Sequence, residues 1–273
     1  MLYILVLATS CQSSSKKNDA HHMTSSEEYQ AQIKSDKKKQ AELDLPFRGF
    51  NNDKAIRIVA FGSAATNCWT SIEKNKPDLM ILTSTPPKEL SKVPEYRSVR
   101  EKVPFMCTPN TEGKSEFIKD WPYAKYIIPQ NADGIYHSKT FGTKKNQIQV
   151  IMIDRFNNEQ KWAWLESEFK KPTALKILTS PTQEREKLFN LIVKTKVKNL
   201  ILLPNDRPIA TFEKTEIKNH GYVYEAFTLN GTSTKESEPM NFGVIKIDWS
   251  NRLAELEIRT INDEKVQVLA LKF

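Results

Sequence analysis

Residues 159–206 read EQKWAWLESEFKKPTALKILTSPTQEREKLFNLIVKTKVKNLILLPND, and their pattern decides the fold class. Trp162, Leu165 and Phe169 recur at helical spacing, which predicts an amphipathic helix whose aromatic side chains belong to the core. The apolar run ALKILTS is typical of a buried strand. A second amphipathic helix, QEREKLFNLIVKTKVK, and a second strand, NLILLPND, follow it.

The same alternation extends toward the N-terminus and then stops. AIRIVAFGS, DLMILTS and VPFMCT read as strands, and GIYHSKTFG and NQIQVIMID read as a hairpin. After the quoted stretch come four strand candidates: YVYEAFTL, FGVIKIDW, LAELEIRTI and KVQVLALKF. Helices alternating with strands and then a run of strands favour an α/β (α+β) fold with two packed sheets flanked by helices, rather than a doubly wound sheet.

The composition is that of a globular protein with a basic balance. The 273 residues include 39% hydrophobic and 27% charged residues, with a formal net charge of +8. A positive charge permits nucleic acid, anionic lipid or phosphate partners. The lysines are spread along the chain and we find no arginine-aromatic patch, so we expect no nucleic-acid partner.

The N-terminal stretch MLYILVLATSC is similar to a bacterial lipoprotein signal that ends at Cys11. We therefore predict a signal segment over 1–11, a polar tether over 12–54 and a folded domain over 55–273. In this interpretation a lipid on Cys11 anchors the protein to a membrane of the bacterial cell envelope. Leu7 lies four residues before the cysteine and the basic start is missing, so a cytosolic protein with an apolar start is the alternative.

The other cysteines, Cys68 and Cys107, fit no zinc-site spacing. Outside the cytoplasm they can form a disulfide in principle.

Eight fragments in a fixed order carry a family resemblance: RIVAFGSA, KPDLMIL, KVPFMCT, GIYHSKTFG, QVIMIDRF, EQKWAWLESEFKK, LILLPNDRPIA and NFGVIKIDW. From Ile56 onward the chain resembles the alkaline phosphatase D (PhoD-like) family of the calcineurin-like metallophosphoesterases. The resemblance implies a four-layer αββα sandwich of two mixed β-sheets flanked by helices. It also implies hydrolysis of phosphate esters by metal ions held at strand ends, where cations about 3.5–4 Å apart activate water.

The resemblance implies a metal site at the strand ends. Most of the metal ligands of the family are replaced by other residues in this chain. Ala64 replaces a cysteine ligand after the first strand, and Ser84 and Thr85 replace the Gly-Asp pair that supplies a bridging aspartate. Cys68, a few residues after Ala64, can replace the missing thiolate only if the loop folds back.

Two further segments complete this vestigial site. Asn110 and Glu112 stand in place of a Trp-Asp-Asp-His-Asp motif, and Asp206, Arg207 and Pro208 stand in place of Asp-x-His. Asp206 is the one weak metal candidate, because hydroxyls and prolines cannot hold a dinuclear centre. Losing the metal and the acidic cluster together is self-consistent, since unneutralised carboxylates repel one another.

We therefore predict a catalytically inactive homologue that acts as a binding or structural module, with no cofactor. The alternative is an active phosphomonoesterase or phosphodiesterase that holds a divalent metal, iron or calcium in a divergent site. The expected partners are the membrane, through the N-terminal lipid, and an unknown protein or phosphate-containing ligand. Arg207 is the residue we would assign to a bound phosphate.

Three other polar features have structural interpretations. Asp154 and Arg155 form either an ion pair at a strand end or a remnant phosphate contact. His137 lies in a strand with a core-facing pattern, and His220 reads as a loop residue. Ser63 lacks the surroundings of a nucleophile elbow.

Overall fold

The computed structural model describes residues 54–63, 67–84, 88–108, 114–121, 127–129, 134–143, 145–181, 183–204, 206–207, 209–218, 220–228 and 240–273. All of them belong to one compact unit, Gln40–Phe273. The predicted signal segment, the lipidation site Cys11 and nearly all of the tether therefore lie outside the described residues. In the described ranges no helix is both long and apolar enough to cross a bilayer.

The first sheet has the strand order β12-β11-β10-β1-β2-β3. Its strands β1, β2 and β3 are parallel, whereas β10, β11 and β12 are antiparallel to their neighbours. The strands are β1 (Ile56–Gly62), β2 (Leu79–Leu82), β3 (Phe105–Cys107), β10 (Asn241–Asp248), β11 (Leu253–Thr260) and β12 (Lys265–Lys272). The sheet is therefore mixed, and the carboxyl ends of β1, β2 and β3 lie at the same edge.

The second sheet has the order β4-β5-β6-β7-β9-β8 and is also mixed. Strands β5, β6, β7 and β9 are parallel, and the outer strands β4 and β8 are antiparallel to their partners. The strands are β4 (Tyr136–Thr143), β5 (Asn146–Ile153), β6 (Leu175–Ser180), β7 (Leu200–Pro204), β8 (Thr211–Ile217) and β9 (Gly221–Phe227). Its parallel strands contain the runs that the sequence predicts as buried.

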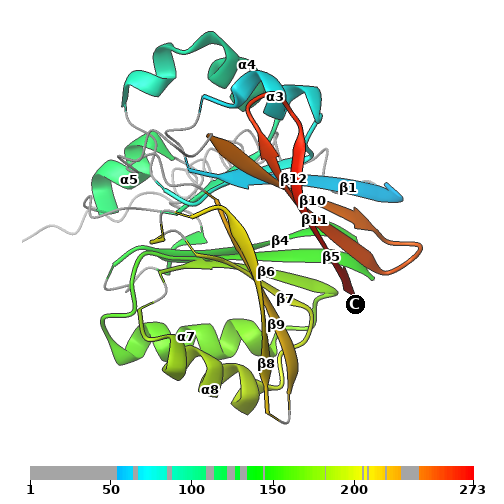
Figure 1. Ribbon diagram of the computed structural model, residues 1–273. Helices are drawn as coiled ribbons and strands as arrows, with labels where there is room; N and C mark the ends of the chain where they lie inside the picture. The colour runs from blue at the N-terminus through cyan, green and yellow to red at the C-terminus, as the bar shows by residue number, and fades with distance from the viewer. Residues whose placement is uncertain are drawn as a thin grey trace, which may run out of the picture. The chain divides into compact units, whose positions relative to one another are not determined.

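Helices cover the outer face of each sheet (Figure 1). On the first sheet lie α3 (Trp69–Lys74) and α4 (Pro94–Lys102), and on the second lie α7 (Glu159–Lys170) and α8 (Arg185–Thr195). Helix α7 begins where the Asn158 side chain accepts a hydrogen bond of 2.9 Å from the Lys161 amide, which satisfies a free N–H of the first turn.

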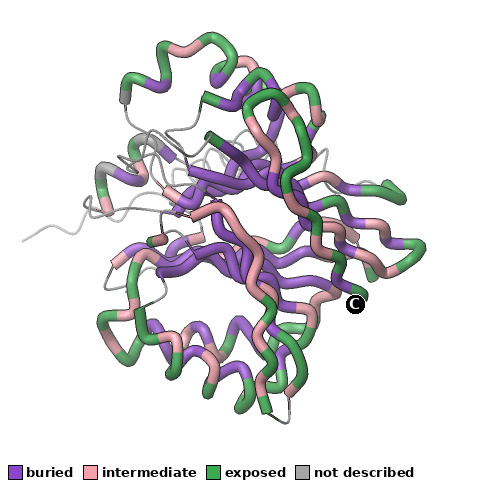
Figure 2. The backbone as a smooth tube through the Cα atoms, viewed as in Figure 1, coloured by how far each residue is buried: buried purple, intermediate pink, exposed green. Residues whose placement is uncertain are grey.

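Two apolar clusters hold these layers together. One lies between the sheets and continues under α3 and α4, and it contains residues as distant in sequence as Ile72, Val150 and Leu256. The other lies between the second sheet and its helices and includes Leu165 and Ile192. The central strands are mostly buried, while the outer sides of the helices are exposed (Figure 2). The predicted arrangement of two mixed sheets flanked by helices is confirmed.

The sequence-based prediction missed several elements. Strand β8 was not expected because TFEKTEI is polar, and it pairs only with β9 at the sheet edge. Helix α4 was missed because its buried residues Tyr96 and Val99 lie in an otherwise charged segment. Short η2 (Lys88–Lys92) and α5 (Lys114–Asp120) were missed as well.

Candidate functional site

The parallel strands of the first sheet end in short hydroxyl side chains on one edge. Ser63 follows β1, and Thr83 and Ser84 follow β2. The Ser63 and Ser84 Oγ atoms lie 3.1 Å apart and share a hydrogen bond. Because the two strands are parallel in register, their carboxyl ends must meet at the same edge. Ala64 and Thr85 are outside the described residues.

The second sheet presents the same chemistry at its corresponding strand ends. Thr179 and Ser180 close β6 and are buried, and Thr228 follows β9 and is also buried. Thr179 Oγ1 lies 2.6 Å from Oγ1 of Thr108, the residue that follows β3. This hydrogen bond joins the two sheets directly at the edge where the resemblance locates the metal site.

Cys68 and Cys107 are buried and are not joined in a disulfide. Cys107 Sγ lies 3.6 Å from the Ser84 carbonyl oxygen and 3.4 Å from that of Thr108. Cys68 precedes α3, and its carbonyl accepts the Ile72 amide at 2.8 Å. The disulfide that is possible in an oxidising compartment is not formed here.

Asp206 is an exposed carboxylate just past the end of β7. The neighbouring Arg207 donates to Glu213 Oε1 of β8 at 2.8 Å and lies over the Phe227 ring, 5.1 Å from its centre. The Glu213 carboxylate therefore offsets the charge of Arg207, and an anion bound at Arg207 would have to compete with it. Asn205 and Pro208, which flank this pair, are not among the described residues.

A network of charged side chains extends from Arg207 across the outer strands. Glu213 also faces Arg185 of α8 at 3.5 Å, and Arg185 contacts Glu225 of β9 closely. Burial raises the pKa of Glu225, and Arg185 opposes that shift. Sequence reasoning missed this network because its members belong to different elements. Arg185 of α8 and Glu225 of β9, for example, lie 40 residues apart along the chain. The one signal was a glutamate within the apolar run YVYEAF.

Asp154 at the end of β5 forms a structural ion pair, but with a different partner from the expected Arg155. The Lys161 Nζ atom of α7 donates to Asp154 Oδ1 at 2.6 Å, and the lysine side chain is fully buried. Arg155 is exposed and contributes its backbone amide to the Asp154 carboxylate. Gly134 allows this approach, because a Cβ there would lie 2.7 Å from Lys161 Nζ, and its φ of 105° suits glycine.

The two histidines in the described part of the chain, His137 and His220, lie on different elements. His137 of β4 is fully buried and faces the core between the sheets, with its ring centre 6.0 Å from that of Phe117. Burial lowers the pKa of His137 to about 3, so its imidazole is neutral at pH 7. His220 lies in the turn between β8 and β9, where burial and then Lys198 lower its pKa.

The described residues at this edge do not fit a dinuclear metal centre. Such a centre takes several carboxylates, imidazoles or thiolates that converge from different strands. Within the described ranges no three His, Cys, Asp or Glu side chains come together in a group suited to a metal ion. What converges instead is a set of neutral hydroxyls that bond to one another, as at Ser63–Ser84 and Thr108–Thr179. The candidates Asn110 and Glu112 fall outside the described ranges.

Comparison with known proteins gives structural likenesses alone. No family model matches the chain, and no curated protein matches it. A predicted phosphoesterase from Streptococcus pneumoniae is 9% identical, with 81% of this chain and 100% of that chain covered and a TM-score of 0.39. A Vps29 double mutant from Entamoeba histolytica is 13% identical over 80% of this chain and 99% of that chain, with a TM-score of 0.40.

A third similar structure is YfcE, a phosphoesterase from E. coli. It is 10% identical over 78% of this chain and 98% of its own, with a TM-score of 0.36. At such identities the site of this chain has to be judged on its own residues.

Proposed function

We propose that this protein is a catalytically inactive member of the calcineurin-like metallophosphoesterases, of the alkaline phosphatase D-like type, that acts as a binding or structural module. The observation that carries the proposal is the hydrogen bonding between hydroxyls at the carboxyl edge. Ser63 pairs with Ser84, and Thr108 pairs with Thr179 across the two sheets.

These pairs matter because of what a metal site requires. Neutral hydroxyls are weak ligands compared with the carboxylates that bridge two cations. A cluster of carboxylates without metal would be destabilised by like-charge repulsion, whereas paired hydroxyls are satisfied without any ion. The hydrogen bond between Thr108 and Thr179 therefore links the two sheets at the edge where an active homologue would hold its metal ions.

The sequence supports the same conclusion for the loops that follow the strands. Ala64 and Pro208 stand where the resemblance implies a thiolate and an imidazole, and neither residue type can bind a metal through its side chain. Asn110 and Glu112 do carry oxygen donors. The competing possibility, an active phosphoesterase with a divergent site, depends on these two residues together with Asp206, with Cys68 as a further candidate.

The experiment measures metal content and turnover on the purified full chain. We expect less than stoichiometric iron, calcium, zinc and manganese by elemental analysis, and no hydrolysis of bis(p-nitrophenyl) phosphate when these ions are added. The matched variants are Asp206→Ala and Glu95→Ala, which each remove one exposed carboxylate. Stoichiometric metal with a turnover that Asp206→Ala abolishes and Glu95→Ala retains would overturn the proposal.

The module is further proposed to be anchored in the bacterial envelope through a lipid on Cys11. Support comes from the sequence ATSC at the end of the apolar start. When the chain is expressed in a bacterium, we expect the protein in the detergent phase of a Triton X-114 extract. The Cys11→Ser variant should move to the aqueous phase, and identical partition of the two would contradict the anchor.

A further inference from the structure

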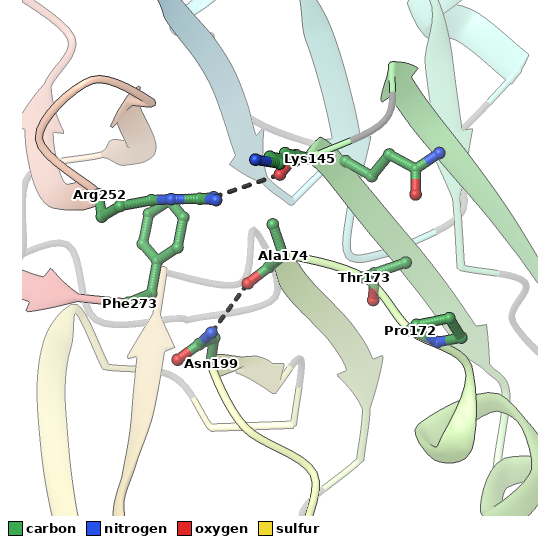
Figure 3. A pocket seen from close by; sticks show the side chains of 8 residues that line it. Lys145, Pro172, Thr173, Ala174, Asn199, Arg252 and Phe273 are labelled. Atoms are coloured by element: carbon green, nitrogen blue, oxygen red, sulfur yellow. Dashed lines mark hydrogen bonds between the residues drawn. The ribbon is translucent and has the colours of Figure 1, made fainter.

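A pocket opens at the edge opposite the hydroxyl cluster. It lies at the amino ends of β6 and β7, where the loops before these strands meet the β10–β11 turn and the end of the chain (Figure 3). Its volume is about 500 Å³, within the range of small-molecule sites. The lining residues are Lys145, Gln147, Pro172, Thr173, Ala174, Asn199, Arg252 and Phe273.

The charged side chains that line this pocket have one sign. Lys145 and Arg252 are the charged residues of the lining, and both are cations. The other lining residues divide into polar groups that can donate hydrogen bonds, such as the Thr173 hydroxyl, and apolar groups, such as the Phe273 ring. An anion with an apolar body matches this combination, because cations and donors hold the charged end while the ring covers the remainder.

The guanidinium of Arg252 is already held in place. Its Nη1 donates to the Lys145 carbonyl oxygen at 3.2 Å, and its carbon lies 5.8 Å from the centre of the Phe273 ring. Figure 3 shows the guanidinium extended above that ring toward Lys145. An arginine restrained in this way loses less conformational entropy when it binds a carboxylate or phosphate than a freely rotating one.

The backbone beneath these groups is also unusual. Arg252 has φ of 51° and Asn199 has φ of 55°, both in the left-handed region. Asparagine tolerates this conformation, and Asn199 is further held by its bond of 2.9 Å to the Ala174 carbonyl. Arginine, unlike glycine, pays a steric cost for a positive φ. The backbone conformation alone would therefore favour glycine at position 252.

We propose that this pocket binds a small organic anion, whose carboxylate or phosphate group is held by Arg252 and Lys145 and whose apolar part packs on Phe273. The site is separate from the hydroxyl edge. It therefore does not depend on whether the protein is inactive as a phosphoesterase.

The test titrates the full chain with benzoate and, separately, with phenyl phosphate, and uses isothermal titration calorimetry at low salt. We expect saturable binding of at least one of the two, and no saturable binding of the uncharged analogue benzamide. The stronger of the two anions identifies the charged group that the site prefers. Absence of saturable binding for both anions would overturn the proposal.

Variants connect the binding to the pocket. Arg252→Gly removes the guanidinium while it keeps a residue that accepts the positive φ, and we expect it to weaken binding about tenfold, the loss of one charge-assisted bond. Lys145→Gln should weaken binding in the same direction. Arg97→Gln removes an exposed cation on α4 and should leave affinity unchanged. Equal affinity in Arg252→Gly and the unsubstituted protein, with both folded by circular dichroism, would overturn the proposal.

Discussion

We expect acid to lower the stability of this protein in part because the His137 imidazole takes up a proton when the chain unfolds. The side chain is fully buried between the sheets, and burial lowers its pKa to about 3. In the unfolded chain the same group titrates near its ordinary value of 6.5. Between these two values the unfolded state binds a proton that the folded state does not, so stability falls as pH falls.

The size of this effect follows from linkage. Each pH unit below the unfolded value costs about 1.4 kcal/mol until the folded pKa is approached. Between pH 7 and pH 4.5, His137 should therefore remove about 2.5 kcal/mol from the free energy of unfolding. This result depends little on the depressed value, because pH 4.5 is well above it.

The assay is urea-induced unfolding of the unsubstituted protein and His137→Leu at both pH values. Leucine has a similar volume, does not titrate and suits the apolar surroundings, which include Phe117. We expect the variant to lose about 2.5 kcal/mol less than the unsubstituted protein on acidification, because all other groups titrate alike in both. An equal loss in the two proteins would refute the assignment of a depressed pKa to His137.

Two further substitutions probe the packing. Gly243→Ala places a Cβ 2.0 Å from the buried Phe61 ring, so we expect a loss of about 1–3 kcal/mol in urea unfolding at neutral pH; a loss within error of zero would show that the ring has room to move. Asp154→Ala leaves the buried Lys161 ammonium without its carboxylate and should cost about 3 kcal/mol. Adding Lys161→Met should restore part of that stability. If the double variant were less stable in urea unfolding than Asp154→Ala alone and Lys161→Met alone, the ion-pair assignment would be contradicted.

Helix–strand alternation is a local property, and for this reason much of the fold could be predicted. The apolar spacing along α7 and the apolar runs of β6 and β7 are each set by which faces of a single element are buried. Polar elements such as β8 escaped prediction, because an edge strand needs no apolar face when its one partner supplies the hydrogen bonds.

The identity of the hydroxyls at the strand ends, and of Asp206 as a lone acidic residue near β7, was likewise readable along the chain. Only the tertiary structure decided what those groups contact. Thr108 meets Thr179 from 71 residues away, and Lys161 rather than Arg155 neutralises Asp154. Residue types and the spacing of apolar residues are local properties that the sequence shows directly. Hydrogen bonds, ion pairs and pockets depend instead on which distant elements the packing of the two sheets brings into contact.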